Sequence, residues 1–309
     1  MRYTLILTAL FCMSCDQNQP DLPKPPPSAL TSTTPTPLIQ KPHVAPPTPS
    51  LSAILLARDE DDRSRDTARH PKETLDFFRI KPGMTVAEAL PGKGWYSKIL
   101  MSYLGENGVL VGIDYEFSMW PHFPFVDDSF MTKRKHWAHD WPIETTLWNI
   151  DEPSQVEAYT FATVPEALDA KFDRVLFIRA LHNLSRFNDK GAFMENALKT
   201  TFRMLKPGGL VGVVQHQSPE TAEDSWADGT NGYLKKSAVI KFFSTSGFEL
   251  ISESSINENP KDQPTSKDAV WRLPPTLRTN KDNEKYKGDY EEIGESNRMT
   301  LLFKKPYNE

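Results

Sequence analysis

The sequence predicts an α/β domain built on a mostly parallel, seven-stranded sheet with helices on both faces. Residues 84–114 read as strand, turn, helix and strand. Residues 175–178 form a continuous apolar run, which is typical of a strand buried on both faces of a parallel sheet. A helical stripe ends in Lys206-Pro207-Gly208-Gly209 and leads into a second such run. Strands that alternate with helices in this way favour parallel pairing.

The first strand, residues 84–90, follows a short helix that begins near Pro71, because proline fits the first helical turn. After the turn at residues 91–94, five residues recur at i, i+3, i+4, i+7 and i+8 and predict one apolar helix face. They are Tyr96, Ile99, Leu100, Tyr103 and Leu104. Residues 109–114 then form the second strand.

The remaining strands are predicted at residues 156–161, 173–178, 210–214, 248–251 and 299–303, with the last one antiparallel. Helices are expected over residues 194–205 and 238–243. Residues 255–297 are too long for a simple turn and form an insertion.

The segment 117–148 carries eight aromatic residues in no clear period. Most of these rings are expected in the core, and Trp120 or Trp137 is a candidate for substrate contact. The eight are Phe117, Trp120, Phe123, Phe125, Phe130, Trp137, Trp141 and Trp148.

The turn after the first strand has the composition of a ligand-binding loop. Gly92 and Gly94 allow a tight turn and close approach of a ligand to the helix N-terminus. Asp114 ends the second strand about twenty residues later, where a carboxylate can accept hydrogen bonds from ribose hydroxyls. The pattern favours an adenosine-type ligand, and an ordinary strand-to-helix turn is the alternative.

The pattern Glu88-x-Leu90-x-Gly92-x-Gly94 resembles the first motif of class I S-adenosylmethionine-dependent methyltransferases, D/E-x-G-x-G-x-G. Leu90 departs from it, because the family usually has glycine there. The Leu-Lys-Pro-Gly-Gly turn is a second resemblance. The chain is also similar to a group of bacterial predicted methyltransferase-like proteins, whose patterns match residues 65–71, 91–96, 179–183, 271–277 and 293–301.

The resemblance implies a Rossmann-like class I methyltransferase fold and S-adenosylmethionine as cofactor. Glu88, Pro91, Gly92, Gly94 and Asp114 are the cofactor-binding residues that it implies.

Arg179, His182 and Asn183 follow the fourth strand and are the predicted catalytic residues, since ligands bind beyond the carboxyl ends of such strands. An unperturbed histidine titrates near neutrality, which suits His182 to remove a proton from the acceptor. In the alternative, His182 and Asn183 only tie down the loop. His216 is a weaker second candidate, and two histidines without an acidic partner at a fixed spacing do not predict a metal site.

The first 51 residues are predicted to lie outside the domain, which spans residues 52–309. Residues 1–15 resemble a bacterial lipoprotein signal that is cleaved before Cys15, which is then lipidated. Plain secretion and an uncleaved anchor are the alternatives. Residues 16–51 are rich in proline and threonine and predict a disordered linker. Cys12 and Cys15 are the two cysteines, so the domain has no disulfide framework.

These features predict an exported, lipid-anchored methyltransferase that acts on a small molecule, with an acceptor that no motif identifies. A catalytically inactive binding module of the cell envelope is the alternative, which Leu90 and export away from the cytosolic cofactor favour. A nicotinamide-dependent oxidoreductase ranks lower, because the third glycine of its fingerprint is missing. The net charge of −5, without a basic aromatic stripe, disfavours nucleic-acid binding. The missing D/N-P-P-Y/F signature disfavours amino groups of bases or amide side chains as acceptors.

Overall fold

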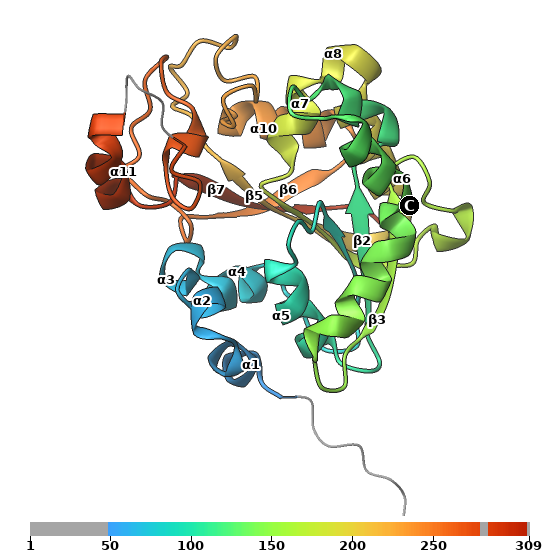
Figure 1. Cartoon of the computed structure of the whole chain (residues 1–309). Coiled ribbons are helices and arrows are strands. Elements are labelled where there is room, and N and C mark those ends of the chain that lie inside the picture. The colour runs from blue at the N-terminus through green and yellow to red at the C-terminus, as the bar shows by residue number, and fades with distance from the viewer. Residues whose placement is uncertain (1–48, 279–283, 308–309) are drawn as a thin grey trace, which may run out of the picture. The chain divides into compact units, whose positions relative to one another are not determined.

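The structure, a computed structural model, describes residues 49–278 and 284–307. The predicted signal with Cys15 and nearly all of the predicted linker lie outside the described residues. The sheet has seven strands in the order β3-β2-β1-β4-β5-β7-β6. They are β1 (Thr85–Ala89), β2 (Val109–Asp114), β3 (Gln155–Thr160), β4 (Phe172–Ile178), β5 (Leu205–His216), β6 (Glu249–Ser254) and β7 (Arg298–Lys304). β7 runs antiparallel to both neighbours, and the strands from β3 to β5 pair in parallel, as predicted (Figure 1).

Each predicted strand is present, and the largest difference in bounds is at β5. Leu205 pairs with Phe172 immediately after the preceding helix, and regular pairing resumes only at Arg174 and Leu210. The Lys-Pro-Gly-Gly turn therefore forms a bulge within the strand, with Gly208 at a φ of 76°.

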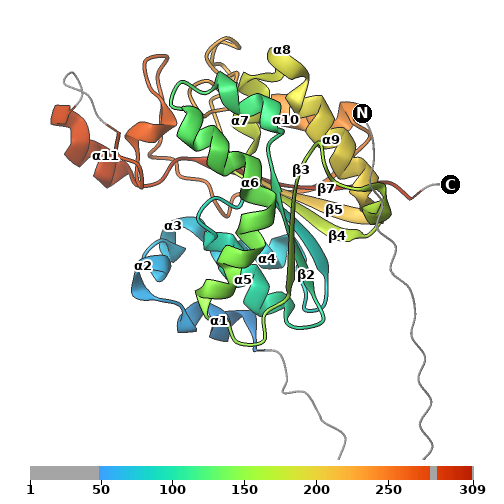
Figure 2. The ribbon, with the colours of Figure 1, turned by 45° about the vertical axis from the view of Figure 1, so that its right-hand side comes forward.

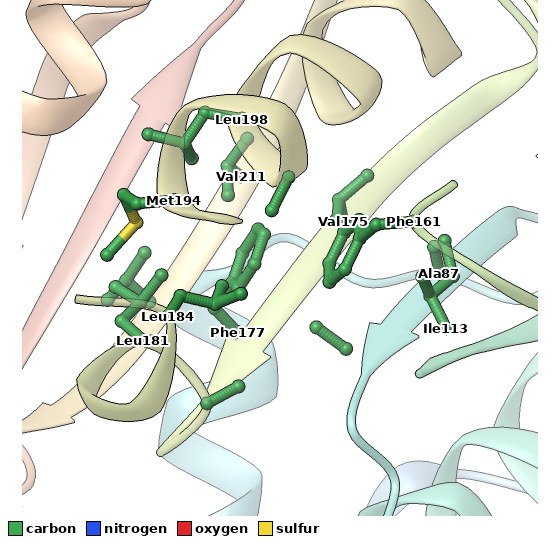
Figure 3. Close-up of a cluster of buried hydrophobic side chains, with 14 of the residues drawn as sticks. Ala87, Ile113, Phe161, Val175, Phe177, Leu181, Leu184, Met194, Leu198 and Val211 are labelled. Atoms are coloured by element: carbon green, nitrogen blue, oxygen red, sulfur yellow. The ribbon is translucent and has the colours of Figure 1, made fainter. Parts of the chain in front are cut away.

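Helices cover both faces of the sheet (Figure 2). One side has α1 (Leu51–Ala57), α2 (Glu60–Arg63), α3 (Asp66–Arg69), α4 (Pro71–Phe77) and α5 (Trp95–Leu104); the other has α7 (Leu181–Arg186), α8 (Asn188–Gly191), α9 (Phe193–Met204) and α10 (Lys236–Thr245). Strand side chains alternate between the two cores, so that Leu176 faces the first and Phe177 the second. Figure 3 shows Phe177 beside Leu181, Leu184 and Met194.

The aromatic segment contains an 18-residue helix, α6 (Asp128–Thr145), that periodicity did not predict. Its only buried residues are Trp141 and Thr145, so it has no apolar stripe. It packs against β3, between the short 3₁₀ helices η1 (Phe117–His122) and η2 (Thr146–Trp148). We call residues 117–148 the cover segment.

The insertion, described at residues 255–278 and 284–297, folds back onto the domain. It contains the short helices η4 (Val270–Arg272), η5 (Glu284–Tyr286) and α11 (Lys287–Ile293). The 3₁₀ helix η3 (Glu166–Leu168) lies outside the insertion, between β3 and β4. The Asn257 side chain donates to Thr74 in α4 and to Thr300 in β7, each at 3.0 Å. Buried Asp262 accepts from Tyr233 and pairs with Arg272 at 2.8 Å. In the described ranges, no helix is both long and apolar enough to span a membrane.

Candidate functional site

A cavity of about 580 Å³ opens at the carboxyl ends of β1, β4 and β5. Its floor is formed by the loop after β1, by Arg179 and His182 beyond β4, and by His216 at the end of β5. Helices α2 and α3 and the insertion supply its other walls. The order of the sheet reverses between β1 and β4, and this is the place where open α/β sheets bind ligands. The volume is in the range of small-molecule sites.

Three of the five predicted cofactor residues, Glu88, Pro91 and Gly92, line this cavity. Glu88 is 3% exposed, and Ser97 Oγ donates to its Oε2 at 2.6 Å. Burial raises the pKa of Glu88 to about 8, against the weaker opposing effect of that hydrogen bond. The side chain is therefore mostly neutral near pH 7 and adds little negative charge to the cavity.

Leu90 lines the cavity at the position where the family motif has glycine. Its φ of 55° lies in the left-handed region, which costs a residue with a side chain about 1–2 kcal/mol. Its amide donates to the Ile113 carbonyl at 2.7 Å, which holds the loop against the end of β2. The backbone thus keeps the conformation that suits glycine, while the side chain occupies the space that glycine would leave.

The cover segment packs against the other two predicted cofactor residues, Gly94 and Asp114. A Cβ on Gly94 would lie 2.3 Å from Cη2 of Trp148, so the indole ring rests directly on this glycine. Asp114 is buried, and Arg134 of α6 lies 2.7 Å from its Oδ2 and donates to its Oδ1 at 2.8 Å. Burial raises the pKa of Asp114 to about 6, and Arg134 opposes this shift.

Trp120 and Trp137 hold Arg134 and do not line the cavity. The guanidinium carbon lies 4.2 Å from the ring centroid of Trp120 and 5.3 Å from that of Trp137. Substrate contact by either ring thus stays a prediction, because neither ring reaches this cavity in the described structure. Trp95 and Trp271 line the cavity instead.

The three predicted catalytic residues separate into two groups. Arg179 and His182 line the cavity, whereas Asn183 Nδ2 donates to Tyr115 Oη at 3.4 Å and Tyr115 donates to the Ala180 carbonyl. Asn183 thus ties down the loop, as the alternative interpretation expected.

The two histidines lie together in the cavity, with ring centroids 5.7 Å apart. Burial lowers the pKa of His182 to about 4, so its environment is not that of the unperturbed histidine on which the predicted role as a base depends. Burial and His182 lower the pKa of His216, whose Nδ1 lies 2.5 Å from Ser296 Oγ. The described ranges contain no group of three histidine, cysteine or acidic residues that could hold a metal ion.

Sequence reasoning missed a cluster of arginines at the cavity wall. Glu295 is surrounded by Arg69 at 3.1 Å, Arg298 at 3.0 Å and Arg65 at 4.0 Å, and all but Arg65 are buried. We call these four residues the arginine cluster. Its members belong to the patterns at residues 65–71 and 293–301, which served only as family markers.

The strand order, with β7 inserted antiparallel between β5 and β6, is that of the Rossmann-like class I methyltransferase fold. Comparisons with protein-family models and with curated proteins find no match.

Solved structures similar to the chain include an S-adenosylmethionine-dependent methyltransferase from Aquifex aeolicus (14% identity, 83% of this chain and 98% of that one, TM-score 0.43). They also include geranyl diphosphate methyltransferase in complex with S-adenosylmethionine (10%, 82% and 94%, 0.46) and the [4+2]-cyclase SpnF (15%, 78% and 81%, 0.46). At these identities and scores, the fold class rests on the chain's own strand order.

Proposed function

We propose that the chain is an S-adenosylmethionine-dependent methyltransferase that acts on a small molecule. The observation that carries this proposal is the cavity at the reversal of the sheet order, beside the loop of Pro91 and Gly92. Glu88 and this loop would hold the methionine end of the cofactor. Bound S-adenosylmethionine would supply a methyl group on a sulfonium, and the chain would align an acceptor with it.

The nucleoside end of the cofactor fits only if the cover segment moves. Asp114 would accept from the ribose hydroxyls, yet Arg134 contacts both of its carboxylate oxygens and Trp148 lies on Gly94. The same contacts favour the second candidate function, a binding module without catalysis. The two candidates differ in whether S-adenosylmethionine can displace Arg134.

The Arg134→Met variant should bind S-adenosylhomocysteine about tenfold more tightly than the wild type, since a charge-assisted hydrogen bond is worth about 1.5–3 kcal/mol and tenfold corresponds to about 1.4 kcal/mol. Methionine keeps the apolar contact with Trp120 and Trp137 but no longer competes for Asp114. Calorimetric titration of the two purified proteins measures the difference.

Lys133→Met, at the neighbouring exposed position of α6, is the matched control and should leave the affinity unchanged. Equal or weaker binding by the Arg134 variant would contradict the competition between Arg134 and the ribose. Binding by neither protein would favour the module without catalysis.

We also propose, from residues 1–15, that the protein is exported and anchored through a lipid on Cys15. Mass analysis of the protein purified from bacterial membranes tests this. A lipidated chain that starts at Cys15 is expected, and an unmodified chain that starts at Met1 would overturn it.

A further inference from the structure

Arg179 is a half-buried cation whose side chain the protein itself leaves unpaired. The side chain of Arg179 lines the cavity, and this side chain has no hydrogen bond or ion pair with any described residue. Its backbone is held at a φ of 59°, where its amide donates to the Val214 carbonyl at 2.7 Å. Burial and the nearby Arg69 and Arg298 lower the pKa of Arg179 to about 10, so it remains charged at neutral pH.

The neighbouring charges do not neutralise Arg179. The arginine cluster contributes three guanidinium groups and one carboxylate, and that carboxylate already contacts two buried arginines. Glu88 is mostly neutral near pH 7. Of the other acids in the lining, Asp62 pairs with Lys98 at 3.0 Å and Asp61 is exposed. The inner wall therefore has an excess of positive charge.

The part of the wall that residues 270–275 of the insertion contribute is mostly apolar. Val270, Leu273 and Pro274 line the cavity, and the Trp271 ring centroid lies 6.1 Å from that of His182. This wall suits the apolar body of a ligand whose anionic group reaches Arg179. The insertion thus builds one wall of the cavity.

The two cavity histidines are weak bases, so they are poorly suited to remove a proton from the group that is to be methylated. Both are buried and uncharged, and His182 Nδ1 is a buried atom with no hydrogen-bond partner in the described structure. A phenol, an alcohol or an ammonium group must lose a proton for methylation, whereas a carboxylate arrives with a free lone pair. The positive wall also disfavours an ammonium group.

We propose that the methyl acceptor is a small carboxylate with an apolar body, whose carboxylate group is held by Arg179. This inference rests on the proposed methyltransferase function. A carboxylate oxygen would attack the methyl carbon of the donor. The new C–O bond forms as the C–S bond breaks, and the electron pair of that bond stays on sulfur. The products are a methyl ester and a neutral thioether, so no proton is released and no base is required.

Binding of 4-phenylbutyrate and its amide, 4-phenylbutyramide, to the purified full-length protein tests the assignment. The probes share an apolar body and differ in the negative charge. With saturating S-adenosylhomocysteine, we expect the carboxylate to bind at least tenfold more tightly than the amide. Arg179→Met should remove this preference without lowering the melting temperature, because the side chain has no hydrogen bond or ion pair to lose. Arg179→Lys, which keeps the charge, should retain most of it.

Arg186→Met removes an arginine of α7 that does not line the cavity and should leave the preference unchanged. With S-adenosylmethionine labelled in its methyl group, turnover should give a product that releases labelled methanol in alkali, as methyl esters do. Equal binding of carboxylate and amide, with S-adenosylhomocysteine still bound, would overturn the inference and leave the proposed function intact. A loss of S-adenosylhomocysteine binding in Arg179→Met, without a loss of carboxylate binding, would also overturn it. Failure of the wild type to bind S-adenosylhomocysteine would instead reject the proposed function.

Discussion

Replacing Glu295 with alanine should destabilise the protein by about 3–5 kcal/mol, the usual cost of leaving buried charges without their partner. Glu295 accepts from Arg69 through both carboxylate oxygens, at 3.1 and 3.2 Å, and from Arg298 at 3.0 Å. Both arginines are buried, so the variant leaves two guanidinium groups that repel each other. Urea unfolding of the two proteins measures the loss as a lower midpoint.

Two further variants separate charge from packing. Glu295→Gln keeps the shape without the charge and should lose nearly as much stability. Glu249→Ala removes a half-exposed carboxylate that pairs with Lys304 at 2.8 Å, and it should cost less than about 1 kcal/mol. A loss in Glu295→Ala as small as in Glu249→Ala would contradict the buried arginine cluster. Because Glu295 belongs to the insertion and Arg69 to α3, a large loss would also show that this contact holds the cavity walls together.

The Glu88→Gln variant should be more stable than the wild type near neutral pH. Folding raises the pKa of Glu88 from 4.5 to about 8, so the folded chain keeps a proton that the unfolded chain releases. The free energy of unfolding that Glu88 contributes is therefore fully present below pH 4.5 and falls as the pH rises towards 8. At about 1.4 kcal/mol for each pH unit, the variant should gain about 3 kcal/mol at about pH 7.

The difference between the two proteins isolates Glu88 from other groups, since the buried histidines shift stability in the opposite direction as the pH falls. Unfolding at a series of pH values should show the gain shrinking towards zero as the pH approaches 4.5, where Glu88 is protonated in both states. Glu106→Gln, at an exposed position, is the control and should show no such trend. A gain that does not depend on pH would contradict a neutral buried Glu88.

The strands and the helices α4, α5, α9 and α10 followed from local patterns. Alternation and apolar runs located every strand of the sheet, and a single stripe located α5. Helix α6 was not predicted, because contacts with distant parts of the chain hold it in place. Trp141 packs into the core, and Arg134 reaches Asp114, which is 20 residues away. A search for amphipathic periodicity cannot detect a helix that is held in this way.

The candidate site was predictable where its residues lie at the end of a strand or directly after one. Glu88, Gly92, Arg179 and His182 all line the cavity, because parallel strands bring their carboxyl ends to one edge of the sheet. Arg69 and Glu295 lie 226 residues apart, and no local pattern indicates that they meet. Burial likewise decides the protonation of Glu88 and His182, and burial is a property of the folded chain.

Hydrogen exchange followed by mass spectrometry, with and without S-adenosylhomocysteine, tests most directly that the cofactor enters at the loop after β1. We expect slower exchange of the backbone amides at residues 90–96, where the ligand binds. We also expect faster exchange in α6, where Arg134 loses its contact with Asp114. Unchanged exchange at residues 90–96 with saturating ligand would contradict cofactor binding in this cavity.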